Sequence, residues 1–176
     1  MSVRASLICA SLLTVTFVTC SEGGGSGTSG SEHPNRDQAG AVLVDEQGLG
    51  AQGYDLVAYF VDGHAVRGSE KYTTSFEGVT YRFASADHLA LFREHPRRYL
   101  PAFGGYCAFA VAAKNAKVVP NPETFRIQDG RLLLFFNGPY QNQVVDTSAM
   151  WDENPRELLA QADQHWQALE RTERDQ

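Results

Sequence analysis

The segment from Phe76 to Cys107 constrains the fold more than any other part of this 176-residue chain. Residues 79–83 alternate apolar and polar side chains, which is typical of a half-buried strand. Ser85 is a good helix N-cap, and the apolar residues that follow it keep helical spacing until Pro96. A double glycine comes next, and the segment ends at the cysteine. The pattern predicts a strand, a helix from Ser85 to Glu94 and a tight turn.

Turn-forming dipeptides predict further strands on both sides of this segment. The predicted hairpins pair 57–61 with 64–67 across Asp62-Gly63, 72–76 with 79–84 across Glu77-Gly78, and 124–128 with 131–136 across Asp129-Gly130.

Two other segments complete the predicted fold. Residues 106–113 are apolar throughout, and their periodicity leaves a buried helix and a strand equally open. Residues from Pro155 onward carry apolar side chains at helical spacing. The predicted fold class is therefore α+β, with a small antiparallel sheet of hairpins covered by the central helix and a C-terminal helix. The predicted domain spans 42–170, and 171–176 form a charged tail.

The N-terminus has the pattern of an export signal over residues 1–19. Arg4 precedes an apolar stretch that is too short to span a bilayer comfortably. Phe17-Val18-Thr19-Cys20 resembles a bacterial lipobox, which implies cleavage before Cys20 and lipidation of that cysteine. Residues 20–41 then read as a flexible polar linker. The alternative is an ordinary secretory signal, with Cys20 left as a loop thiol.

The resemblance to bacterial lipoproteins also implies a location. It places the chain in the cell envelope, facing the periplasm and held on the membrane by its lipid. Ser21 is not the acidic residue that retains many such proteins at the inner membrane, so the outer membrane is favoured.

Charge limits the kinds of partner. The 15 basic residues include Arg4, so a chain without residues 1–19 has 14 basic and 21 acidic residues, a net charge of −7. Nucleic-acid binding needs a basic surface, so no nucleic-acid partner is expected. An envelope protein partner is compatible with the composition, and the oligomeric state stays open.

Cysteine usage directs attention to one thiol. The chain has 3 cysteines; Cys9 lies in the signal and Cys20 is the predicted lipid site, which leaves Cys107 without an intramolecular partner. A buried, small apolar role for Cys107 is one interpretation. A metal-binding or reactive thiolate is the other.

Scattered motifs resemble one family, the YHS-domain proteins of bacterial envelopes. They are Gly53-Tyr54-Asp55, Val57-Ala58-Tyr59-Phe60, Tyr81-Arg82-Phe83-Ala84-Ser85, Phe92, Pro96, Tyr99, Gly104-Gly105-Tyr106-Cys107-Ala108, Asp129-Gly130-Arg131-Leu132, Ala162-Asp163 and Trp166. Modules of the wider YHS and TRASH group are associated with metal binding through cysteines. This chain departs from that pattern, because Ala84 stands where such a module has cysteine and no cysteine lies near Asp87. The resemblance implies no catalytic residues.

The candidate site follows from the lone thiol and this resemblance. Copper or zinc would bind the thiolate of Cys107, with His64, His88 or His95 as a second donor, because sulfur and imidazole suit these metals. Each histidine is also compatible with a plain surface position. Candidate pocket residues are Tyr54, Asp55, Tyr59 and Tyr106, for which the alternative is a core position with hydrogen-bonded hydroxyl groups.

Three functional hypotheses remain at this stage. The first is a non-enzymatic, membrane-tethered envelope protein that binds a transition metal through Cys107. The second is a ligand-free interaction module in the envelope. The third, an enzyme with Cys107 as nucleophile, needs an adjacent histidine and an exposed thiol, and the first two are preferred.

Overall fold

The computed structural model describes residues 42–174, so the predicted signal, the lipid site at Cys20, the linker and residues 175–176 lie outside it. The short helical turns η1 and η2 span Ala51–Gly53 and Ala102–Gly105. The other elements are α1 (Ala58–Val61), β1 (Ser69–Phe76), β2 (Val79–Phe83), α2 (Ala86–Glu94), α3 (Pro96–Tyr99), α4 (Ala108–Lys114), β3 (Asn121–Gln128), β4 (Arg131–Phe135), β5 (Asn137–Tyr140), β6 (Gln143–Asp146), α5 (Thr147–Asp152) and α6 (Pro155–Arg174). The predicted α+β class is confirmed. Each hairpin forms its own two-stranded antiparallel sheet.

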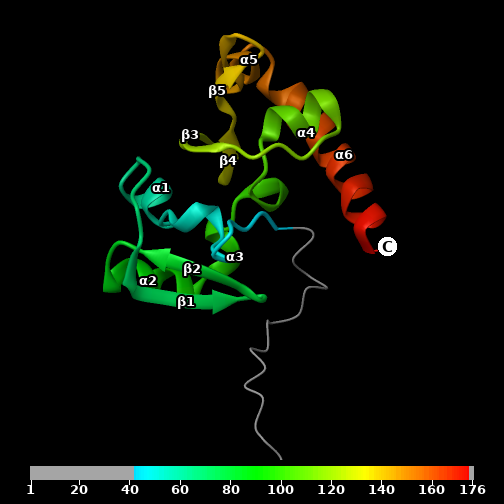
Figure 1. Ribbon diagram of the computed structural model, residues 1–176. Coiled ribbons are helices and arrows are strands. Elements are labelled where there is room, and N and C mark those ends of the chain that lie inside the picture. Colours follow the sequence, from blue (N-terminus) through cyan, green and yellow to red (C-terminus); the bar gives the residue numbers. More distant parts are fainter. Residues whose placement is uncertain (1–41, 175–176) are drawn as a thin grey trace, which may run out of the picture. The chain divides into compact units, whose positions relative to one another are not determined.

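The first hairpin and the helix after it form as predicted (Figure 1). Strands β1 and β2 pair with Phe76 opposite Val79. The Ser85 hydroxyl accepts a hydrogen bond from the backbone N–H of His88, which caps α2. Phe92 of α2 packs on the rings of Tyr81 and Phe83, with centroids 5.3 and 4.9 Å away. These ring contacts fix α2 against the apolar face of β2.

The strand predicted over 57–61 is wrong, because this segment forms the helix α1. Asp55 explains the difference: its Oδ1 accepts hydrogen bonds from the backbone N–H groups of Val57 (2.8 Å) and Ala58 (3.2 Å). These bonds satisfy two of the donors that a helix start leaves unpaired. The predicted return strand 64–67 is represented by one isolated bridge between Tyr54 and Arg67.

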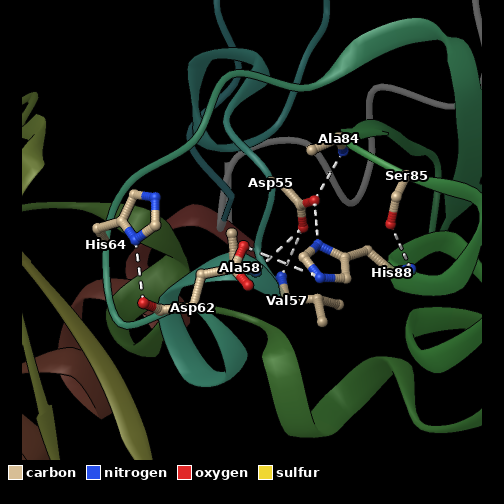
Figure 2. A network of polar contacts seen from close by, with 8 residues as sticks. All are labelled: Asp55, Val57, Ala58, Asp62, His64, Ala84, Ser85 and His88. Atoms are coloured by element: carbon tan, nitrogen blue, oxygen red, sulfur yellow. Dashed lines mark hydrogen bonds and ion pairs between the residues drawn. The ribbon is translucent and has the colours of Figure 1, made fainter.

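Asp55 also joins α1 to the first hairpin and to α2 (Figure 2). Its Oδ2 accepts from the backbone N–H of Ala84 and from Nδ1 of His88, both at 2.7 Å. A carboxylate only accepts hydrogen bonds, so Nδ1 of this imidazole carries the hydrogen. The Asp55 residue is 0% exposed, and four donors surround its carboxylate. This buried carboxylate therefore holds three elements together.

The second hairpin separates two cores. β4 is buried along Leu132–Phe135, and its side chains alternate between the two sides. Leu132 and Leu134 join the core around Tyr59 and Phe83, whereas Leu133 and Phe135 join the core around Trp151. The predicted pairing of 124–128 with 131–136 is confirmed by the β3–β4 ladder, in which Gln128 lies opposite Arg131.

The C-terminal half adds helices and a third hairpin. Segment 106–113, left open by its periodicity, forms the helix α4 from Ala108. The predicted C-terminal helix is confirmed as α6, which runs beside α4 (Figure 1) and extends into the predicted tail, to Arg174. The β5–β6 hairpin was not predicted. Its turn residues Gln141 and Asn142 both have positive φ (46° and 65°), as a tight two-residue hairpin turn requires.

We expect Asp55→Asn to destabilise the domain by about 2–4 kcal/mol, because the new amide NH₂ would face backbone N–H donors on whichever side it lies. Urea unfolding followed by circular dichroism measures this loss. Asp62→Asn is the matched control, since the Asp62 carboxylate is partly exposed and lies 3.9 Å from Nε2 of His88. The control should stay within about 0.5 kcal/mol of wild type. Equal stability of Asp55→Asn and wild type would contradict the network.

Candidate functional site

A cavity of about 430 Å³ lies between α4 and the β5–β6 hairpin. This volume falls within the range of small-molecule sites in proteins. Most of its lining is apolar. The lining residues are Cys107, Phe109, Ala110, Ala113, Lys114, Val118, Phe136, Tyr140, Gln143, Val145, Thr147 and Met150.

Both walls follow from the periodicity of their elements. On α4 the lining residues 109, 110, 113 and 114 share one face, while Ala108, Val111 and Ala112 are buried in the core beside α6. In the hairpin, Tyr140 pairs with Gln143 and Gly138 pairs with Val145. Paired residues of an antiparallel ladder share a face. One complete face of the hairpin therefore points at the cavity.

Gly138 leaves open space on that face. A Cβ built on Gly138 would meet only the Phe136 ring, at 3.6 and 3.9 Å, which is ordinary contact. A larger side chain at this position would therefore project toward the cavity without a backbone clash. Because glycine has no side chain, it leaves this part of the cavity face unfilled.

Burial distinguishes a floor from a rim. Cys107, Ala110 and Thr147 are buried, whereas Ala113, Lys114, Tyr140, Gln143 and Met150 are exposed. The cavity therefore has a largely apolar interior, and its rim carries the polar groups of Lys114, Tyr140 and Gln143 beside two apolar side chains.

Cys107 lies at the floor with its hydrogen-bonding groups satisfied. Its sulfur is 3.3 Å from the backbone N of Phe136, which donates to it. Its sulfur is also 3.4 Å from Oγ1 of Thr147, whose own hydroxyl donates to the Phe136 carbonyl at 2.8 Å. The thiol is therefore the donor to Thr147. The residue is 0% exposed, which agrees with the buried interpretation of this cysteine.

A charged N-cap fixes α5, the helix that supplies two residues of the lining. Oδ1 of Asp146 accepts from the backbone N–H and the hydroxyl of Ser148 at the start of α5. The hydroxyl contact is the main cause that lowers the pKa of Asp146 below its usual value. Helix α5 contributes Thr147 and Met150 to the lining.

The three candidate histidines lie elsewhere. His64 is exposed, with Nδ1 3.0 Å from the carbonyl of Asp62, and His88 is held by Asp55 (Figure 2). His95 is exposed and lines an open hollow of about 560 Å³ with Phe76, Glu94, Pro96, Arg97 and Arg98. None of the three lines the cavity of Cys107. Among residues 42–174, no group of three or more His, Cys, Asp or Glu side chains could hold a metal ion.

The predicted pocket residues also lie outside both cavities. The hydroxyl of Tyr59 donates to the carbonyl of Pro122 at 2.9 Å, and that of Tyr54 donates to Oε1 of Glu123 at 3.1 Å. Burial raises the pKa of Tyr59 well above its usual value. Tyr106 packs near Trp166, with ring centroids 6.2 Å apart. Tyr54, Asp55 and Tyr59 therefore occupy core positions with hydrogen-bonded polar groups.

Of the residues that line the cavity, Cys107 is the only one that the sequence analysis proposed as a site residue. The sequence gives no clear signal for the hairpin, because residues 136–140 and 143–147 do not alternate regularly between apolar and polar side chains. The turn residues Gln141-Asn142 lack glycine, so they do not stand out as a hairpin turn.

Comparison of the chain with protein-family models, with curated proteins and with solved structures finds no match. The YHS resemblance therefore stays a prediction. In the described part of the chain, no helix is both long enough and apolar enough to cross a bilayer.

We expect the Cys107 thiol to resist modification while the domain is folded. In a chain with Cys9→Ser and Cys20→Ser, Cys107 is the single thiol. Its reaction with 5,5′-dithiobis(2-nitrobenzoate) in buffer should be at least about a hundredfold slower than in denaturant, because reaction requires local opening. Equal rates in the two solutions would show that the thiol is accessible in the folded protein.

Proposed function

We propose that this chain is a non-enzymatic, lipid-tethered protein of the bacterial envelope whose domain binds a small apolar molecule in the cavity above Cys107. The tether and the location rest on the lipobox-like segment ending at Cys20, the signal pattern before it and the polar linker after it. The resemblance to YHS-domain envelope proteins is in accord with both.

The cavity is the observation that carries the binding proposal. Its volume of about 430 Å³ is ample for a small organic molecule, and its floor and walls are mainly apolar. Burial of apolar surface would supply the affinity. The few polar groups at the rim would orient the ligand.

A non-catalytic role agrees with the surroundings of the two most reactive groups. A cysteine nucleophile needs a neighbouring base, and no histidine lines the cavity of Cys107. The Asp55–His88 pair has the composition of a catalytic pair, but the Asp55 carboxylate is engaged by three backbone N–H groups and joins α1, β2 and α2. These contacts support a structural role for the pair.

Copper or zinc binding at Cys107 is the second candidate. One observation favours copper(I): the thioether of Met150 lines the same cavity as the Cys107 thiol, and both are soft ligands. Equilibrium dialysis separates this function from the first. Stoichiometric copper(I) or zinc binding that disappears in Cys107→Ser would favour the metal, and equal binding by both proteins would reject it.

A ligand-free interaction module is the remaining alternative. The outer face of the β5–β6 hairpin exposes Val144 at 77%, and Tyr140 is 57% exposed at the rim. Exposed apolar side chains of this kind also occur where proteins dock. A chain of this type would bind an envelope partner and leave the cavity empty of small molecules.

We expect the uncharged fluorophore N-phenyl-1-naphthylamine to bind and brighten in the cavity. Gly138→Leu places an apolar side chain on the cavity face and should weaken this binding at least about tenfold. Val144→Leu places the same side chain on the opposite face and should leave the affinity within about twofold of wild type. Fluorescence titration measures both. Unchanged binding by Gly138→Leu would contradict the proposed site.

We expect Cys20→Ala to abolish both lipid attachment and membrane retention when the full chain is expressed in a bacterium. The checks are metabolic labelling with palmitate and cell fractionation. Cys9→Ala is the matched control, because it removes a cysteine from the predicted signal and should keep the label. Palmitate incorporation by the Cys20→Ala chain would contradict the predicted anchor.

A further inference from the structure

We infer that the cavity is built for an amphipathic carboxylate, whose apolar chain lies over Cys107 and whose carboxylate pairs with Lys114. This inference rests on the proposed binding function and deepens it. It starts from the charges around the cavity rather than from the thiol.

Lys114 is the only charged side chain among the lining residues, because the lining contains no arginine, aspartate or glutamate. It lies at the exposed rim. Within the described residues, no carboxylate pairs with its ammonium group. The chain as a whole carries a net charge of −6, so a lining with a single cation and no acid departs from the average surface. An anionic headgroup at this rim would meet attraction and no facing carboxylate.

The gradient of polarity gives the ligand a direction. Gln143 and Tyr140 stand at the rim and add polar groups that could hydrogen-bond a carboxylate. Toward the floor, the lining changes to Ala110, Val145 and Phe136. Thr147 and Cys107 lie deepest, but their polar groups are already bonded to each other and to the Phe136 backbone. The deep end of the cavity therefore favours an apolar group of the ligand.

Asp146, the nearest acid along the hairpin strand, faces away from the cavity. In β6, Gln143 and Val145 share the cavity face, so Val144 and Asp146 belong to the opposite face. The Asp146 carboxylate is occupied by Ser148. It therefore does not compete for Lys114 inside the cavity.

The volume sets the size of the ligand. At about 430 Å³, the space lies toward the lower end of the range of small-molecule sites in proteins. A straight-chain carboxylate with roughly ten to twelve carbons is a ligand of this size class.

Isothermal titration calorimetry with sodium decanoate tests the inference on the full chain carrying Cys20→Ser, which cannot be acylated at that position. We expect decanoate to bind one per chain and more tightly than 1-decanol, which has the same chain without the charge. Lys114→Gln should weaken decanoate binding about fivefold to tenfold and leave decanol binding unchanged. Lys71→Gln removes the same charge on β1, away from the cavity, and should change neither.

Each result decides between the two levels of the proposal. The carboxylate inference would be overturned if wild type did not bind decanoate. It would also be overturned if Lys114→Gln and Lys71→Gln had the same affinity for decanoate. If the neutral fluorophore still binds and is still blocked by Gly138→Leu, the apolar cavity stands and only the ligand class is wrong. If wild type does not bind the fluorophore, the proposed function itself is wrong.

Discussion

Burial of β4 on both faces is the constraint on which the rest of the structure depends. Leu132 and Leu134 complete one core, and Leu133 and Phe135 complete the other. Full burial of such side chains contributes about 1.5–3 kcal/mol each, so this short strand stabilises both halves at once. It also sets the position of the cavity floor, because Cys107 forms a parallel bridge to Leu134. The chain then enters α4, which supplies one wall of the cavity.

Local signals in the sequence predicted the parts of the fold that local chemistry determines. The Ser85 cap, the alternation over 79–83 and the turn at Asp129-Gly130 each act within a few residues, and the structure contains all three. The prediction of a strand over 57–61 was wrong because a distant contact, and not local chemistry, determines this segment. Its β-branched and aromatic residues favour a strand, but Asp55 caps a helix there. That carboxylate is itself fixed by Ala84 and His88, about thirty residues away, and such a tertiary contact has no local pattern.

The candidate site was less predictable than the fold. A lone thiol can be picked out by counting cysteines, and Cys107 does lie at the cavity. The walls could not be identified, because they meet only when α4 packs beside a hairpin some thirty residues further along the chain. Histidine positions mislead for a similar reason: His88 reads as a surface residue on a helix, yet its partner Asp55 lies 33 residues earlier. Sequence spacing carries no information on that pairing.

The architecture of the cavity couples the binding of a ligand to the stability of the β5–β6 hairpin. An isolated two-stranded hairpin is marginally stable in water, and among residues 42–174 the β5–β6 sheet contains these two strands alone. Its outer face is exposed at Val144, so the hairpin depends on contacts along its inner face. Those contacts are incomplete where the cavity separates the hairpin from α4. A ligand that fills the space would replace the missing apolar contacts and stabilise the hairpin by mass action. A wall that is itself only a two-stranded sheet is therefore the one that a ligand would hold in place.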